Sequence, residues 1–119
     1  MLNVLIADDE KLARLTIASL LKERSDIGEI YQARNGSEIR QQVTQYQPDL
    51  IFLDIQMPGQ NGIDIATELQ ITERVIFATA YHQKSQEIKA LGALDCLLKP
   101  FDDESFHRVL DHAIASVAK

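Results

Sequence analysis

The chain contains a single cysteine, Cys96, among its 119 residues. A lone cysteine excludes a disulfide within the chain and a zinc site built from several cysteines. Long hydrophobic runs are also absent, since no apolar segment approaches the roughly 18 residues of a membrane span. The opening residues reach Asp8-Asp9-Glu10 too early for a signal peptide. The sequence therefore predicts a cytoplasmic protein with no membrane segment.

Basic residues are outnumbered, because 12 lysines and arginines face 18 aspartates and glutamates and leave a formal charge of -6. This excess of negative charge argues against nonspecific binding to nucleic acid or to an anionic membrane. Any anionic ligand would need a local arrangement that receives it. The length and the 45% hydrophobic content are those of one globular domain spanning residues 1–119.

Short apolar runs alternate along the chain with stretches of helical periodicity. Residues 4–7, 50–53 and 75–78 are continuous apolar runs of strand length, typical of strands buried on both faces. Residues 94–98 predict a fifth strand, and the more polar stretch 27–33 suits a strand at the edge of a sheet.

Five helical stretches lie between and after these strands. They cover residues 10–24, the segment from Asn35-Gly36 to Pro48, the segment after Gly62, a short polar stretch at 83–91, and a final stretch that begins after Asp102. The alternation predicts an α/β fold in which five strands and five helices form a doubly wound, five-stranded parallel sheet. This is the flavodoxin-like arrangement, with strand order 2-1-3-4-5.

Charged and polar side chains stand where these predicted strands end. Asp8 and Asp9 follow the first strand, and Asp54 follows the third. Thr79 ends the fourth strand, and Lys99 ends the fifth. Ligands of such sheets bind at the carboxyl ends of the strands, so we expect these five side chains to converge there.

Three neighbouring carboxylates repel one another unless a cation lies between them. A hard divalent ion with oxygen ligands, Mg²⁺ above all, would neutralise the group and could accept a phosphoryl oxygen in place of water. In this arrangement Asp54 would be the nucleophile of phosphoryl transfer and would form an acyl phosphate. Lys99 would stabilise the charge of the transferring group, and Thr79 would donate a hydrogen bond to it.

Each residue taken alone also has an ordinary structural interpretation. Asp8 or Asp9 could cap the helix that starts near Glu10, and Asp54 could belong to the turn before Met57-Pro58-Gly59. Thr79 could be a simple strand-end residue. The joint placement at four strand ends favours the functional interpretation.

The chain resembles a receiver domain of two-component response regulators. The motifs that carry the resemblance are spread over the chain in the family's order and spacing: Val4-Leu5-Ile6-Ala7-Asp8-Asp9-Glu10, Asp49-Leu50-Ile51-Phe52-Leu53-Asp54-Ile55-Gln56-Met57-Pro58-Gly59-Gln60-Asn61-Gly62, Ile76-Phe77-Ala78-Thr79-Ala80 and Leu97-Leu98-Lys99-Pro100-Phe101.

The resemblance implies that Asp54 accepts a phosphoryl group from a sensor histidine kinase. It implies that Mg²⁺ is held by three carboxylates and one backbone carbonyl, those of Asp8, Asp9, Asp54 and Gln56. It also implies that Thr79 and Lys99 contact the phosphoryl group and that the Lys99-Pro100 peptide is cis. Such a domain is not an enzyme acting on other substrates, since it catalyses only its own phosphorylation and dephosphorylation.

Receivers are expected to switch when Thr79 moves toward the phosphoryl group and reshapes the fourth helix, fifth strand and fifth helix. That face is also the expected surface for a homodimer. The position that usually holds an aromatic partner of the threonine is Cys96 here, which leaves a small packing residue or a redox role as its interpretations. We expect Tyr81 to take part of the aromatic role and to shield the acyl phosphate from water; a half-buried tyrosine without that role is the alternative.

The segment 93–102, with Ile76-Phe77-Ala78-Thr79-Ala80-Tyr81, resembles receivers joined to LytTR-type DNA-binding domains. DNA would then be bound only through an output domain outside these residues; a stand-alone receiver is the alternative. A haloacid-dehalogenase-like phosphohydrolase would need an Asp-x-Asp pattern, which the adjacent Asp8 and Asp9 do not form. A flavin or nucleotide binder would need a phosphate loop where this chain has acidic residues.

The three histidines do not form a metal-binding set. His107 and His112 are five residues apart on the predicted last helix, so they do not share a face. We expect both of them, and His82, to be surface or partner-contact residues.

Overall fold

The computed structural model describes residues 1–80 and 85–117 and forms a layered α/β domain. Its main strands are β1 (Leu2–Ala7), β2 (Ile27–Ala33), β3 (Leu50–Asp54), β6 (Val75–Thr79) and β7 (Asp95–Leu98). Its helices are α1 (Lys11–Lys22), α2 (Gly36–Tyr46), α3 (Gly62–Leu69), α4 (Ser85–Ala90) and α5 (Asp103–Val117). Each predicted strand and helix has a counterpart here.

The five main strands form one parallel sheet in the order β2-β1-β3-β6-β7. Counted as the first to fifth strands of the predicted pattern, this is the order 2-1-3-4-5. The prediction of a flavodoxin-like sheet is therefore confirmed, and β2 lies at the edge that its mixed sequence predicted.

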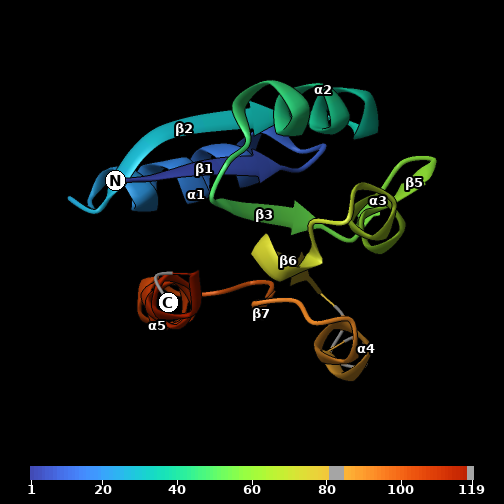
Figure 1. The fold of residues 1–119 in the computed structure, drawn as a ribbon. Coiled ribbons are helices and arrows are strands. Elements are labelled where there is room, and N and C mark those ends of the chain that lie inside the picture. The colour runs from blue at the N-terminus through green and yellow to red at the C-terminus, as the bar shows by residue number, and fades with distance from the viewer. Residues whose placement is uncertain (81–84, 118–119) are drawn as a thin grey trace.

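The helices cover both faces of the sheet, with α1 and α5 on one face and α2, α3 and α4 on the other (Figure 1). Alternate residues of each strand point to opposite faces, so Leu5 and Phe77 pack toward α2, α3 and α4, whereas Ile6 and Phe52 pack toward α1 and α5. This explains why the central strands are apolar throughout.

Capping side chains define where helices begin. Asn35 accepts a hydrogen bond from the Glu38 backbone N–H at the start of α2, and Asn61 accepts one from Ile63 at the start of α3. At the start of α5, Asp102 accepts one from Ser105. Asn35 and Asp102 are the residues at which the sequence predicted the starts of α2 and α5, whereas α3, predicted after Gly62, begins at Gly62 itself.

Two small elements have no counterpart in the sequence analysis. Strands β4 (Gln56–Met57) and β5 (Gln60–Asn61) form an antiparallel hairpin around Pro58 and Gly59, and Thr72–Arg74 form one 3-10 turn, η1. Gly59 has φ +71°, which glycine adopts without strain. The hairpin begins two residues after Asp54, so it borders the carboxyl end of β3.

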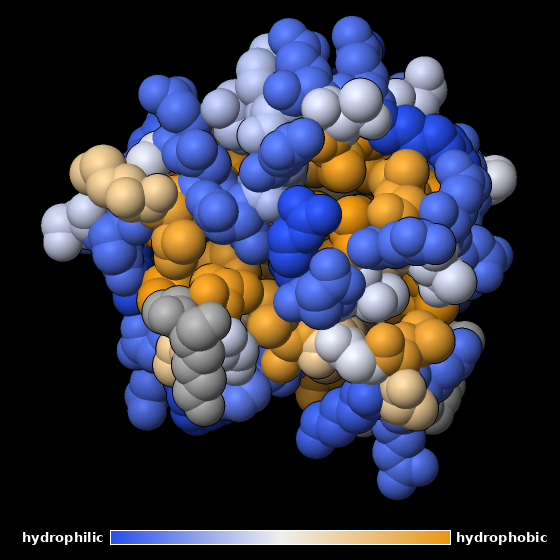
Figure 2. Space-filling model, in the orientation of Figure 1, coloured by the Kyte–Doolittle hydropathy of each residue, from blue (hydrophilic) through white to orange (hydrophobic). Residues whose placement is uncertain are grey.

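On the face shown in Figure 2, hydrophilic residues form most of the rim, and hydrophobic residues are visible between them. Within residues 1–80 and 85–117, no helix has both the length and the apolar character needed to cross a membrane.

Candidate functional site

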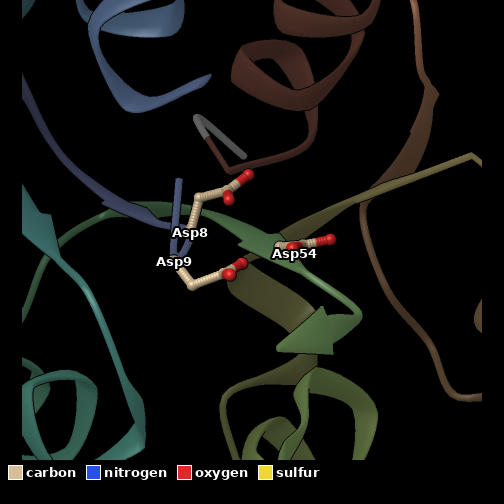
Figure 3. Close-up of side chains that lie close together, drawn as sticks. All are labelled: Asp8, Asp9 and Asp54. Atoms are coloured by element: carbon tan, nitrogen blue, oxygen red, sulfur yellow. The ribbon is translucent and has the colours of Figure 1, made fainter. Parts of the chain in front are cut away.

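Three carboxyl groups meet at the carboxyl ends of two neighbouring strands. Parallel pairing places Ala7 of β1 opposite Leu53 of β3, so Asp8 and Asp54, the next residues, lie side by side. Carboxylate oxygens of Asp8, Asp9 and Asp54 lie within 4.8 Å of one another. Figure 3 shows the three groups extending to the same side of these strand ends. The convergence expected of these residues is thus present in the fold.

Lys99 reaches this cluster from the segment that follows β7. Its Nζ lies 2.8 Å from Oδ2 of Asp8 and 3.6 Å from Oδ1 of Asp54. Its backbone N–H donates to the carbonyl oxygen of Thr79 at 2.8 Å, and the Lys99-Pro100 peptide bond is cis. One ammonium group therefore bridges two buried carboxylates.

Burial and charge act against each other at Asp54. Burial above all, with a contribution from the charges of Asp8 and Asp9, raises the pKa of its carboxyl group to about 6, although Lys99 and the backbone of Gln56 act to lower it. For Lys99, burial alone would lower the pKa, but the hydrogen bond to Asp8 and the charge of Asp54 raise it above its ordinary value. The lysine stays protonated, yet the acidic cluster is not fully neutralised by it.

The donor set fits a hard divalent cation. Asp8 and Asp54 are buried, whereas Asp9 is exposed, so the three oxygens line a site open to solvent on one side. Magnesium prefers such a set, a few carboxylates with several waters retained. Gln56, at the start of β4, is hydrogen-bonded through its backbone to the Asp54 carboxylate, which places it beside the cluster.

Thr79 is the last residue of β6 and is 2% exposed, next to the site at the end of its own strand. Cys96 lies in β7 opposite Phe77 and is half-buried against the core beneath α2, α3 and α4. Burial raises the pKa of its thiol. Of the predicted switch residues, Tyr81 lies outside the described residues, as does His82.

Two residues at the site were missed in the sequence analysis. Gly62 lies so close to the Asp54 carbonyl that an added Cβ would collide with its oxygen. Arg14 of α1 is 7% exposed and donates to the carbonyl oxygen of Asp8. A signal for Arg14 was available, because it lies three residues before Ile17 on the helix face that is otherwise apolar.

An apolar groove of about 360 Å³ runs beside Lys99, between α1 and the segment after β7. Ala13 and Ile17 of α1 line one side, and Pro100 and Phe101 line the other. Leu12 and Leu15, also on α1, are exposed. The approach to the acidic cluster therefore has an apolar border.

His107 and His112 both lie on α5 and take no part in the acidic cluster. His112 Nδ1 is 3.0 Å from a carboxylate oxygen of Asp95, and His107 Nε2 is 3.7 Å from one of Glu23. Both histidines thus contact surface acids.

A doubly wound sheet with an aspartate trio and a lysine at its carboxyl edge is an α/β domain whose ligand site lies where such folds place it, at the strand ends. The family model of the response regulator receiver domain matches residues 4–111. The chain belongs to this family.

Its relatives point to one branch of the family. The chain is 44% identical over 113 residues to the sensory transduction protein LytT of Bacillus subtilis, covering 92% of this chain and 47% of that protein. It is 35% identical over 121 residues to the transcriptional regulatory protein LytR of Staphylococcus aureus, covering 99% and 49%. These relatives agree with the predicted LytTR-type resemblance, and the chain spans about half their length.

Solved structures agree with the fold. The chemotaxis response regulator CheY4 of Vibrio cholerae superposes with a TM-score of 0.82 at 26% identity, covering 95% of this chain and 98% of that one. The response regulatory domain of MrkE from Klebsiella pneumoniae superposes with a TM-score of 0.85 at 25% identity, covering 98% of each chain.

Proposed function

We propose that the chain receives a phosphoryl group on Asp54 from a sensor histidine kinase, with Mg²⁺ bound, and thereby controls an output domain. The observation that carries this proposal is the buried Asp54 carboxylate with Asp8 and Asp9 within 4.8 Å and the Lys99 ammonium at 3.6 Å. The family match favours this role over the phosphohydrolase and flavin-binding alternatives.

In the transfer step, an Asp54 carboxylate oxygen attacks the phosphorus of a phosphohistidine. The new O–P bond forms as the P–N bond breaks, and the electron pair of that bond leaves with the histidine ring, which keeps or takes up a proton. The Lys99 ammonium lies close enough to Asp54 to stabilise the negative charge of the phosphoryl group during transfer. Water would then attack the phosphorus of the acyl phosphate and break its O–P bond, which releases inorganic phosphate and restores Asp54; in both steps the chain acts only on its own aspartate.

The residues that would hold Mg²⁺ are Asp8, Asp9 and Asp54, with the backbone carbonyl of Gln56 as a fourth ligand. When bound, Mg²⁺ supplies positive charge that offsets the repulsion between carboxylates and phosphoryl oxygens. Lys99 contributes by holding Asp8 in place through the 2.8 Å contact. Positioning and electrostatics account for most catalysis in this reaction class.

Switching would run from Thr79 to the α4–β7–α5 face. Thr79 pairs with Leu98 of β7 and accepts the backbone hydrogen bond of Lys99, so a movement of β6 is passed on to β7. Cys96 occupies the position of the usual aromatic partner. If the small Cys96 side chain changes how phosphorylation acts on α4, the Cys96→Tyr variant will differ from the wild type in the NMR shifts of α4 that phosphorylation causes. Identical shifts in the wild type and the variant would contradict this.

The kinase would dock across the apolar groove beside Lys99. This groove is apolar and is lined in part by Lys99, which contacts Asp54, so a partner bound there would lie beside the site. The lengths of the LytT and LytR relatives support an output domain of the LytTR type in the whole protein, and that domain would carry any DNA binding. A receiver acting alone through protein contacts is the alternative.

The test is intact mass after incubation with Mg²⁺ and acetyl phosphate. The wild-type chain should gain one phosphoryl group, Asp54→Asn none, and Asp49→Asn one. Asp49 is a matched control because it is an exposed aspartate preceding the opposite end of the same strand. Failure of the wild type to form any labile adduct with several small donors would exclude the proposed function.

A further inference from the structure

We propose that Arg14 is a positioning residue for the Mg²⁺ site, acting through the peptide that joins Asp8 to Asp9. The inference rests on the proposed function and assigns a role to a side chain that does not touch the carboxylates. It begins from an unusual placement. Arg14 is a charged residue on the buried face of α1, where it is only 7% exposed.

Two hydrogen bonds of this side chain go to residues of, or directly after, the strands beside the site. Nη1 donates to the carbonyl oxygen of Asp8 at 2.7 Å, and Nε donates to Oε1 of Gln32 on β2 at 3.1 Å. A guanidinium group is planar, so two bonds from different nitrogens determine its orientation. The contact to Asp8 is buried, where a charge-assisted bond is strongest.

The carbonyl of Asp8 belongs to the peptide unit that leads to Asp9. Since that unit is planar, the direction of its carbonyl fixes where the Asp9 N–H and Cα lie, and so the point from which the Asp9 side chain starts. Arg14 thereby helps to place Asp9, although its hydrogen bonds go to Asp8 and Gln32. The exposed Asp9 carboxylate is the member of the trio that most needs such support.

The other parts of Asp8 are held by different groups. Its N–H donates to the Ala33 carbonyl, its Oδ1 accepts from the Glu10 N–H at 2.9 Å, and its Oδ2 accepts from Lys99 at 2.8 Å. Without the Arg14 side chain, these three contacts of Asp8 would remain, and only its backbone carbonyl would lose its hydrogen bond. The predicted defect is thus a displaced Asp9, with the Asp8–Lys99 pair intact.

The experiment measures Mg²⁺ affinity by calorimetry for the wild type, Arg14→Met, Arg14→Lys and Arg40→Met. Removing a group that orients a metal ligand typically weakens affinity 10- to 100-fold, and we expect about 10-fold for Arg14→Met. Arg40 is the matched control, because it makes a two-pronged contact with the Glu68 carboxylate on the surface between α2 and α3. Its variant should bind Mg²⁺ like the wild type.

Arg14→Lys separates position from charge. Lysine keeps the charge but lacks the second fixed donor, so we expect it to bind Mg²⁺ nearly as weakly as Arg14→Met. Full recovery in Arg14→Lys would overturn the proposal, since charge alone would then explain the effect. Unchanged affinity in Arg14→Met would overturn it as well.

Two further measurements cover the case in which Arg14→Met does not fold. Gln32→Leu, at an exposed position, removes the bond that orients the guanidinium and should weaken Mg²⁺ binding about threefold; wild-type affinity in that variant would contradict the proposal. In metal-free protein, the amide NMR signal of Asp9 should also shift in Arg14→Lys, and an unmoved signal would count against it.

Failure of the proposed function looks different from failure of this inference. A wild-type chain that binds no Mg²⁺ and gains no phosphoryl group would remove the function itself. A wild type that does both, with Arg14 variants that bind Mg²⁺ equally well, would remove only the role of Arg14.

Discussion

Asp54 is buried at a cost, because a carboxylate beside two others must ionise in a poorly solvated place. Burial, followed by the neighbouring carboxylates, raises its pKa from 3.8 to about 6. The native state therefore retains a proton on this group at pH values where the unfolded chain has already released it. The residue proposed to accept the phosphoryl group is consequently one that weakens the metal-free fold at neutral pH.

The sign of this effect predicts a pH-dependent gain from Asp54→Asn. Between pH 4 and 6 the native state binds more protons than the unfolded state, so the stability of the wild type falls as pH rises through that window. Two pKa units correspond to about 3 kcal/mol, an upper value for a partly solvated group. In EDTA at pH 7.5, Asp54→Asn should unfold at higher urea concentration than the wild type, with the difference vanishing near pH 4.

Asp49→Asn serves as the control, since the Asp49 carboxylate is exposed and accepts a hydrogen bond from the Asn3 N–H. It should show no comparable gain at pH 7.5. An Asp54→Asn variant that is equally stable as the wild type at both pH values would contradict the cost assigned to the buried carboxylate.

Gly62 matters because α3 starts directly against the backbone of Asp54. Its N–H donates to the Ile55 carbonyl at 2.7 Å, and a Cβ would strike the Asp54 carbonyl. Gly62→Ala should therefore lower stability by about 1–3 kcal/mol and slow phosphorylation by acetyl phosphate. Gly59→Ala has open space and only the φ +71° strain, so it should lose stability without slower phosphorylation. Equal phosphorylation rates for both variants would contradict the role of the close contact.

At the scale of elements, hydrophobic patterning was sufficient to predict the parallel sheet and its five helices, whereas the strand order came from the assumed flavodoxin-like arrangement. The predicted boundaries lie within a few residues of the observed ones; the first helix, for example, was predicted from residue 10 and begins at Lys11. The β4–β5 hairpin and η1 were missed because two- and three-residue elements have no periodicity to detect. They depend on contacts made after the chain has folded.

The site was predictable as far as it depends on strand ends. Asp8, Asp9, Asp54 and Lys99 follow apolar runs in the sequence, so the topology alone brings them together. Arg14 and Gly62 were not predicted, because their importance lies in a particular hydrogen bond and a particular close approach. The sequence does show that Arg14 is a charged residue on an apolar helix face. Its role can be inferred only when the structure shows that it donates to the Asp8 carbonyl.

The pairing of α1 with α5 depends in part on Arg24, just after α1. Its guanidinium lies 2.8 Å from Asp26 and 2.7 Å from Asp111 of α5, with its side chain 17% exposed. Arg24→Met should lower the free energy of unfolding by about 0.5–1 kcal/mol, since the arginine is shielded from solvent although Asp26 and Asp111 are exposed and partly screened. Urea titration checks this, with phosphorylation by acetyl phosphate unchanged.

Arg34 provides the comparison for Arg24. It pairs with Glu38 at 2.8 Å, but its side chain is 68% exposed. Solvent screens such a pair, so Arg34→Met should show no measurable loss of stability. If Arg24→Met and Arg34→Met behave alike, burial is not what gives the Arg24 contacts their strength.

For the whole molecule, the formal charge of -6 has a local component. Part of it is gathered in Asp8, Asp9 and Asp54 at one edge of the sheet, where it can hold a cation that in turn receives an anion. The α4–β7–α5 face lies away from this edge and has a different character. A hollow of about 640 Å³ there combines apolar residues with both signs of charge, from Lys89, Asp95 and Arg108.

Such a mixed surface can be self-complementary across a two-fold axis, with an acidic group of one copy facing a basic group of the other.

We expect phosphorylation on Asp54 to promote a homodimer through this face, because Thr79 is joined to β7 by the backbone contacts that a shift of β6 would move. Sedimentation of the phosphorylated chain should give about twice the monomer mass, and Arg108→Glu should stay monomeric while still accepting the phosphoryl group. Arg40→Glu, on α2, is the matched charge reversal and should still dimerise. A fully phosphorylated wild type that remains monomeric would contradict the prediction, and the switch would then have to act on a different partner through the same face.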